Sequence, residues 1–128
     1  YEFCNSFNLP YIKTIHINDS LITYDSKTID GASCILFDNQ DKNIKGGTGK
    51  NFDWKILNSN DEVKKLISSK PHIIAGGLSL ENVDDLLLTY SPYGLDASSG
   101  LEHSIGNKDH ELMTRFVERV REFDRKSK

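Results

Sequence analysis

The sequence predicts an α/β fold built around a parallel β-sheet, and three observations support this. Short apolar segments have the length of buried strands, amphipathic helical patterns separate them, and glycine, serine or aspartate follows most of them. Short buried strands that alternate with amphipathic helices are typical of parallel β/α architecture, in which chemistry takes place at the carboxyl ends of the strands. The 128 residues suit one domain.

Four segments are expected to be strands. YIKTIHI alternates and is rich in β-branched residues, whereas the later segments are short continuous apolar runs that suit buried strands. The expected strands are residues 11–17, 34–38, 72–75 and 93–96.

Helical patterns precede and separate these strands. Residues 1–8 suit the tail of a helix, and helices are expected from Asp53 to about Leu57, over residues 61–68 and over residues 108–124. Another should follow Ser79, which is a favourable N-cap residue with Glu81 in the first turn. Residues 18–27 are ambiguous, with one short helix as a possible interpretation, and the polar, glycine-rich residues 39–52 indicate a loop.

The overall composition favours a soluble domain. The formal net charge is −3 without a basic block, which argues against nucleic acid as the main partner, and the apolar runs are too short to span a membrane. Two cysteines form neither a disulfide framework nor a zinc pattern, the four histidines lack metal-ligand spacing, and no secretory signal is expected. We expect a cytoplasmic protein without a metal, whose chain begins inside a longer sequence because its first residue is Tyr1.

The stretch GGTGKNFDW resembles a phosphate-binding loop only at first sight. A P-loop requires a glycine where Ile44 stands and a serine or threonine where Asn51 stands, so this interpretation fails. The alternative is a flexible surface loop, but connections of this length more often serve as functional covers. The predicted cover loop is Gly46, Gly47, Thr48, Gly49 and Lys50.

Two small-residue turns follow the last two expected strands. Glycine lets a ligand approach the backbone, and free N–H groups at helix starts bind anions. The turns therefore predict a phosphate site, against the alternative of tight βα turns without a ligand. The candidate residues are Gly76, Gly77, Ser98, Ser99 and Gly100.

Aspartates close two of the expected strands. Asp38 ends the strand at residues 34–38, where a carboxylate can act as an acid or base, although a turn aspartate bonded to nearby backbone is an equal alternative. Asp96 ends the last strand, and there an orienting role is as well supported as a chemical one.

Taken together, these stretches resemble phosphoribosylanthranilate isomerase, an enzyme family of tryptophan biosynthesis. The matching segments occur in the family's order over nearly the whole chain, and GGTGK followed by FDW is specific to this family rather than to histidine-pathway isomerases. They are LPYIKTIHI, ILFD, GGTGKNFDW, IIAGGLSLENV, GLDASSGLE and NKDHELMTRFV.

The resemblance implies a (βα)8 TIM barrel. Residues 1–128 would be the C-terminal portion of a single barrel domain, covering the end of helix 4 and βα units 5–8. The family's reaction is an Amadori rearrangement, in which the aminoaldose N-(5-phosphoribosyl)anthranilate becomes the aminoketose 1-(2-carboxyphenylamino)-1-deoxyribulose 5-phosphate. It uses no cofactor and no metal.

The family's roles transfer to residues of this chain. Asp38 would be the general acid that protonates the ring oxygen, and Asp96 would contact the anthranilate side. Gly76, Gly77, Ser99 and Gly100 would bind the phosphate through backbone N–H groups, and the loop Gly46 to Lys50 would cover the site.

One family role has no counterpart in the chain. The general base is a cysteine in a Lys-x-Cys-Gly motif at the first strand, which is absent here together with an orienting arginine; neither Cys4 nor Cys34 occupies that place. We therefore expect the N-terminal half of the same barrel as a partner, in the same or another chain. The alternative is a catalytically inactive half barrel that binds the phosphosugar.

Overall fold

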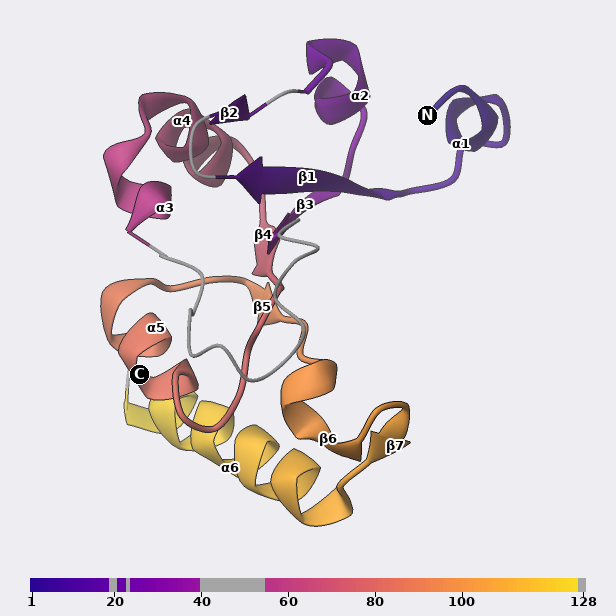
Figure 1. The fold of residues 1–128 in the computed structure, drawn as a ribbon. Coiled ribbons are helices and arrows are strands. Elements are labelled where there is room, and N and C mark those ends of the chain that lie inside the picture. Colours follow the sequence, from indigo (N-terminus) through magenta and orange to yellow (C-terminus); the bar gives the residue numbers. More distant parts are fainter. Residues whose placement is uncertain (19–20, 23, 40–54, 127–128) are drawn as a thin grey trace.

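A five-stranded sheet forms the centre of the molecule. The computed structural model describes residues 1–18, 21–22, 24–39 and 55–126 (Figure 1). The strand order is β2-β1-β3-β4-β5, in which β2 is antiparallel to β1 and the other neighbours are parallel. The strands of this sheet are β1 (Ile12–Asn18), β2 (Leu21–Ile22), β3 (Cys34–Asn39), β4 (His72–Ile74) and β5 (Gly94–Leu95).

The four parallel strands confirm the four that the sequence predicts. β4 and β5 are shorter than expected, but their hydrogen bonds extend to the predicted ends. The Ala75 N–H donates to the Phe37 carbonyl at 2.7 Å, and the Asp96 N–H donates to the Ile74 carbonyl at 2.9 Å. The parallel strands follow one another in chain order, as in a barrel, without the reversal of a doubly wound sheet.

Helices lie between the parallel strands and at both ends of the described chain. The element after β5 is a 3-10 turn, η1 (Ser99–Leu101), followed by a small hairpin of β6 (Glu102–Ser104) and β7 (Asn107–Lys108) that the sequence did not predict. The helices are α1 (Glu2–Ser6), α2 (Ser26–Asp30), α3 (Ile56–Ser59), α4 (Asp61–Ser69), α5 (Val83–Thr89) and α6 (His110–Lys126).

Side-chain caps set the starts of the two longest helices. The Asn60 carboxamide oxygen accepts from the N–H groups of Glu62 and Val63, and the Asp109 carboxylate accepts from those of Glu111 and Leu112. The prediction for α4 is confirmed within one residue. The last helix was expected from residue 108, which is wrong by two residues because Lys108 belongs to β7.

The prediction that Ser79 caps α5 is wrong. This helix begins at Val83, after a turn in which the Ser79 carbonyl accepts from the Val83 N–H at 3.1 Å. Asn82 occupies the N-cap position but makes no capping bond, because its amide bonds to the preceding turn instead.

The core lies between one face of the sheet and the helices. Ile15, Phe37 and Ile74 lie side by side on three strands, and all three are at most 1% exposed. They belong to one cluster with Val63 of α4 and Leu86 of α5. Cys34 is buried.

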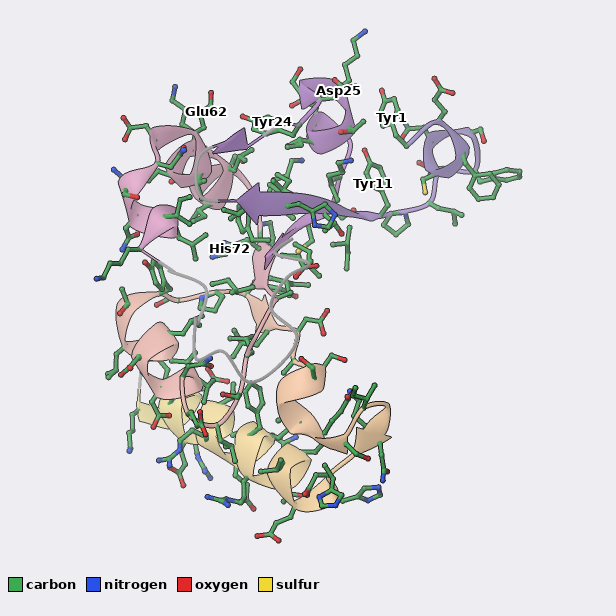
Figure 2. The ribbon with its side chains drawn as sticks, viewed as in Figure 1. Tyr1, Tyr11, Tyr24, Asp25, Glu62 and His72 are labelled. Atoms are coloured by element: carbon green, nitrogen blue, oxygen red, sulfur yellow. The ribbon has the colours of Figure 1, made fainter. Side chains whose placement is uncertain are left out.

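The other face of β1 is open in this chain. Ile12 is 53% exposed, and Thr14 and His16 are also exposed. Figure 1 shows α1 standing apart from the sheet at the start of β1, and Figure 2 shows Tyr1 next to Tyr11, with ring centroids 6.4 Å apart. The Tyr11 hydroxyl donates to the Thr28 carbonyl at 2.7 Å, which joins β1 to α2.

Two leucines of α5 provide a matched test of this core. Leu86 is 1% exposed and Leu88 is 76% exposed. We expect Leu86→Ala to lower the free energy of unfolding by about 2–5 kcal/mol because it leaves a cavity, and Leu88→Ala to lower it by less than about 0.5 kcal/mol. Urea denaturation followed by circular dichroism measures both, and equal losses would contradict the assignment of the buried face of α5.

Candidate functional site

Asp38 lies near the carboxyl end of β3, beside the corresponding end of β1. The registered partner of Asp38 in the parallel pair is His16, so both side chains are on the same face of the sheet. The His16 Nδ1 is 4.0 Å from the Asp38 Oδ2, and the side chains are 45% and 36% exposed. At this separation and exposure, the contact between the two side chains contributes little stability.

His16 is a neighbour that sequence reasoning did not assign to the site. The four histidines of the sequence were considered only as metal ligands. The usable signal was its place in YIKTIHI, because alternation puts it on the face opposite Ile15 and Ile17, at the end of a strand.

Asp96 directly follows β5, at the same end of the sheet as Asp38. Phe37, Ile74 and Leu95 are registered with one another, so the next residues along the three strands are Asp38, Ala75 and Asp96. Those residues alternate to the face opposite the core. Because neighbouring strands are separated by about 4.8 Å, the backbones of Asp38 and Asp96 are about 10 Å apart. Asp96 is exposed.

Gly76 and Gly77 form the turn that leaves β4. Their φ angles are 85° and 72°, a left-handed conformation that side chains disfavour. Asn82, only 7% exposed, lies behind the turn: its Nδ2 donates to the Gly77 carbonyl at 2.8 Å, and its Oδ1 accepts from the Ser79 N–H at 3.0 Å. Sequence reasoning missed Asn82, although a polar residue directly before the apolar positions of α5 was a possible signal.

The second small-residue turn meets the first. A Cβ added at Gly100 would overlap the carbonyl oxygen of Leu78, so the backbones of the two turns are in direct contact. The structure thus brings together two segments that are about twenty residues apart in sequence. Among the described residues, no acceptor bonds to the backbone N–H groups of Gly76, Gly77, Ser99 or Gly100.

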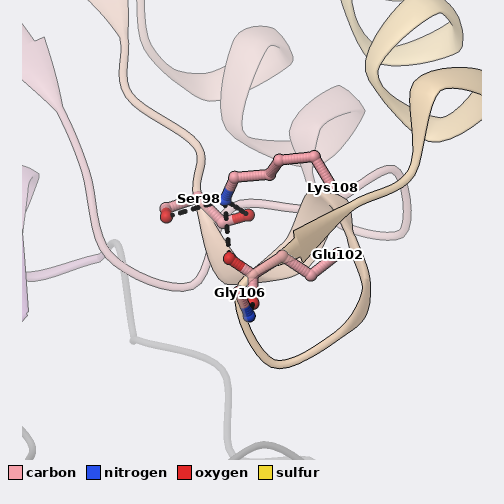
Figure 3. A network of polar contacts seen from close by, with 4 residues as sticks. All are labelled: Ser98, Glu102, Gly106 and Lys108. Atoms are coloured by element: carbon pink, nitrogen blue, oxygen red, sulfur yellow. Dashed lines mark hydrogen bonds and ion pairs between the residues drawn. The ribbon is translucent and has the colours of Figure 1, made fainter.

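Lys108 binds the start of the second turn (Figure 3). Its Nζ donates to the Ser98 carbonyl and to the Ser98 Oγ, both at 3.0 Å, and to the Glu102 Oε1 at 2.7 Å. The Gly106 N–H donates to the Glu102 Oε2 at 3.0 Å. The hydrogen bond from Lys108 is the main reason that the pKa of the Glu102 carboxyl is below its ordinary value. Sequence reasoning missed this network because it placed Lys108 in the last helix.

His72 lies at the opposite, amino end of β4. Its ring packs 6.2 Å from that of Phe37, and burial lowers its pKa, which favours the neutral imidazole (Figure 2). Its environment is therefore that of a packed side chain rather than part of the strand-end site.

Several other features lie elsewhere. The predicted cover loop, Gly46 to Lys50, lies outside the described residues, as do Phe52 and Trp54. A cavity of about 400 Å³ is lined by residues of α5 and α6 only, such as Leu88 and Phe123, and so is separate from the strand ends. In the described part of the chain, no cluster of three or more histidine, cysteine, aspartate or glutamate residues could hold a metal, and no helix could cross a membrane.

Known proteins are similar to the chain over nearly its whole length. An isomerase named N-(5'-phosphoribosyl)anthranilate isomerase from Legionella pneumophila (strain Corby) is 40% identical over 120 residues, which are 93% of this chain and 55% of the relative. The chain therefore spans about half of the length of this relative.

Solved structures show the same fold. Phosphoribosyl anthranilate isomerase from Thermus thermophilus has a TM-score of 0.66 at 24% identity, covering 94% of this chain and 56% of that one. A phosphoribosyl anthranilate isomerase in complex with reduced 1-(o-carboxyphenylamino)-1-deoxyribulose 5-phosphate has a TM-score of 0.59 at 23% identity, covering 91% and 52%. The α/β fold with its parallel sheet is thus of the TIM-barrel type.

The family model described as "N-(5'phosphoribosyl)anthranilate (PRA) isomerase" matches residues 1–119. A match of this extent, together with the fold and the order of the strand-end residues, shows that the chain belongs to the phosphoribosylanthranilate isomerase family.

Proposed function

We propose that the chain is the C-terminal portion, βα units 5–8, of a barrel that isomerises N-(5-phosphoribosyl)anthranilate in tryptophan biosynthesis. The observation that carries the proposal is the arrangement at the carboxyl ends of the parallel strands: Asp38 lies near the end of β3, and two mutually contacting turns follow β4 and β5. A sugar phosphate needs both, an acid at the ring and N–H donors at the phosphate. A related isomerase has been solved with a reduced form of the product, which supports this ligand class.

Asp38 acts as the general acid in this proposal. It donates a proton to the furanose ring oxygen while the bond from that oxygen to C1 breaks, and the anthranilate nitrogen supplies the electron pair that forms the Schiff base. Removal of the C2 proton gives an enolamine, and tautomerisation gives the ketone, so no atom is gained or lost overall. Asp38 is partly exposed at a strand end, where a substrate can reach it. Asp96, about two strand spacings away, contacts the anthranilate side.

The phosphate binds beside the two contacting turns. The backbone N–H groups of Gly76, Gly77, Ser99 and Gly100 bind its oxygens, since these donors have no acceptor among the described residues. Ser98 adds a hydroxyl at the start of the second turn. Neither a cofactor nor a metal takes part.

The N-terminal half of the barrel supplies the base that removes the C2 proton. Neither cysteine of this chain suits that role, because Cys4 lies in α1 and Cys34 is buried at the amino end of β3. The exposed face of β1, with Ile12 and Thr14, is the surface that such a half would cover. A catalytically inactive half barrel that binds the phosphosugar is the second candidate, because the acid and the N–H donors are in place without the base.

An activity assay separates the two candidates. Consumption of phosphoribosylanthranilate is followed by anthranilate fluorescence, for the 128-residue chain and for the full-length gene product. We expect turnover by the full-length protein and none by the chain alone, because the base is absent from it. Turnover by the chain alone would show that it contains the base. Inactivity of the full-length protein would favour the second candidate.

Substitution of the acid tests the mechanism in the full-length protein. We expect Asp38→Asn to lower kcat by about 10²–10⁴-fold, the range for a general acid, with little change in KM because the phosphate contacts remain. Asp85→Asn, the same change at an exposed position of α5, is the control and should leave both constants unchanged. Steady-state kinetics measures these effects, and a normal kcat for Asp38→Asn would remove Asp38 from the mechanism.

A further inference from the structure

The Lys108 ammonium is fully used within the protein. It has three N–H donors, and three acceptors receive them: the Ser98 carbonyl, the Ser98 Oγ and the Glu102 carboxylate. Its charge is also matched by that of Glu102, whose side chain is only 15% exposed. Lys108 is a cation beside a candidate phosphate site, but all of its N–H donors are used and Glu102 balances its charge. It is therefore not expected to bind an anion directly.

The contacts of Lys108 instead fix the position of Ser98. The Ser98 carbonyl receives two hydrogen bonds, one from Lys108 and one from the Leu101 N–H at 3.1 Å that closes η1. The Ser98 Oγ accepts from Lys108, which leaves its own O–H free to donate. Ser99 and Gly100, with their N–H groups, follow directly, so the orientation of Ser98 sets that of both donors.

Glu102 ties Lys108 to the hairpin. One carboxylate oxygen accepts from Lys108 and the other from the Gly106 N–H, in the turn between β6 and β7 where Gly106 has a φ of 77°. Lys108 and Glu102 are also registered partners of the two strands. The hairpin thus holds the ammonium at a fixed distance from the turn (Figure 3).

We propose that Lys108 is a positioning residue of the phosphate site, which with Glu102 holds the Ser98–Gly100 turn in its phosphate-binding conformation. This inference rests on the proposed function, because it assumes that the turn binds the phosphate. A contact of this kind raises affinity by preorganisation: the donors are ordered before the ligand arrives, so the ligand does not bear that entropic cost. The effect is expected in KM and in the binding of free phosphate, and not in the chemical step.

Removal of the ammonium in the full-length protein tests the proposal. We expect Lys108→Met to raise KM about tenfold or more, with kcat within about twofold, because hydrogen bonds to a charged group are lost from the turn alone. The inhibition constant of inorganic phosphate should rise by a similar factor. Lys64→Met, which removes the exposed ion pair with Asp61 (3.1 Å), is the matched control and should change neither constant.

Gly100→Ala distinguishes the failure of this proposal from that of the proposed function. Its Cβ would displace the turn from Leu78, so KM and the phosphate inhibition constant should both rise. If Gly100→Ala raises both and Lys108→Met raises neither, the phosphate site stands and the positioning role is wrong. If neither variant has an effect, the phosphate assignment fails and the present proposal with it.

Should Lys108→Met not fold, Lys108→Arg replaces it. The positioning role predicts a KM near that of the wild type for Lys108→Arg, because arginine keeps the charge and several donors. A KM as high as that of Gly100→Ala would contradict the positioning role.

The lowered pKa of Glu102 predicts how the stability that the Lys108–Glu102 contact contributes depends on pH. Lys108 is the charged group that acts on this carboxyl, and a carboxyl whose pKa is lowered by folding adds stability above its unfolded pKa and loses it as pH falls through the folded value. The difference in unfolding free energy between wild type and Glu102→Gln should therefore be constant above about pH 5.5 and shrink below about pH 4. Urea denaturation across this range measures it. A difference in unfolding free energy that grows on acidification would contradict a stabilising contact between Lys108 and Glu102.

Discussion

The parallel pairing of β1, β3, β4 and β5 is the constraint on which the site depends. Backbone register decides which residues leave the sheet together, and here it places Asp38 and Asp96 at one edge and on one face. The ladder continues past the short strands through the N–H groups of Ala75 and Asp96, so the residues that begin the turns are themselves hydrogen-bonded. A shift of one residue in any pair would turn the aspartates toward the core. The relative positions of Asp38 and Asp96 are therefore set by backbone hydrogen bonds rather than by contacts between the two carboxylates.

Different side chains hold the two turns, Asn82 the turn after β4 and Lys108 the turn after β5. Asn82 is a neutral, buried amide that binds the backbone on both sides of Leu78, whereas Lys108 is a charged group whose partner Glu102 compensates it. Both arrangements occupy carbonyl oxygens and leave N–H groups of the turns without acceptors among the described residues. A turn that donated those N–H groups internally would be more stable and unable to bind an anion. The contacts of Asn82 and Lys108 fix the conformation of the turns without using these N–H groups. Donors that are held in place before a ligand binds are the general requirement for a preorganised site.

Local patterns in the sequence predicted most of the fold, and tertiary contacts decided what they missed. Residues 34–38 and 61–68 were predictable because an apolar run and a 3.6-residue period report directly on burial. The start of α5 was not, because the amide of Asn82 bonds to Gly77 and Ser79 instead of capping the helix. The β6–β7 hairpin contains an ion pair between Glu102 and Lys108, and its strands lack the apolar–polar alternation from which a strand can be predicted. The candidate acid and the two turns could be predicted from their positions at strand ends. The side chains that hold the turns, Asn82 and Lys108, could not, because their contacts with the turns form only in the folded chain.

The division of the proposed active site between two halves has a physical consequence for the contact between them. In the proposed function, Asp38 and the two phosphate-binding turns all lie at the carboxyl ends of strands of one sheet, so their mutual geometry is set within this chain. The base would then be positioned by the other half, across the junction that covers the open face of β1. A reacting group that is misplaced by about 1 Å can cost about a hundredfold in rate. In this proposal, the packing of the other half against the face of β1 that carries Ile12 and Thr14 would therefore affect the rate, although neither residue takes part in the chemistry. His16 lies on the same face, with its Nδ1 4.0 Å from the Asp38 Oδ2.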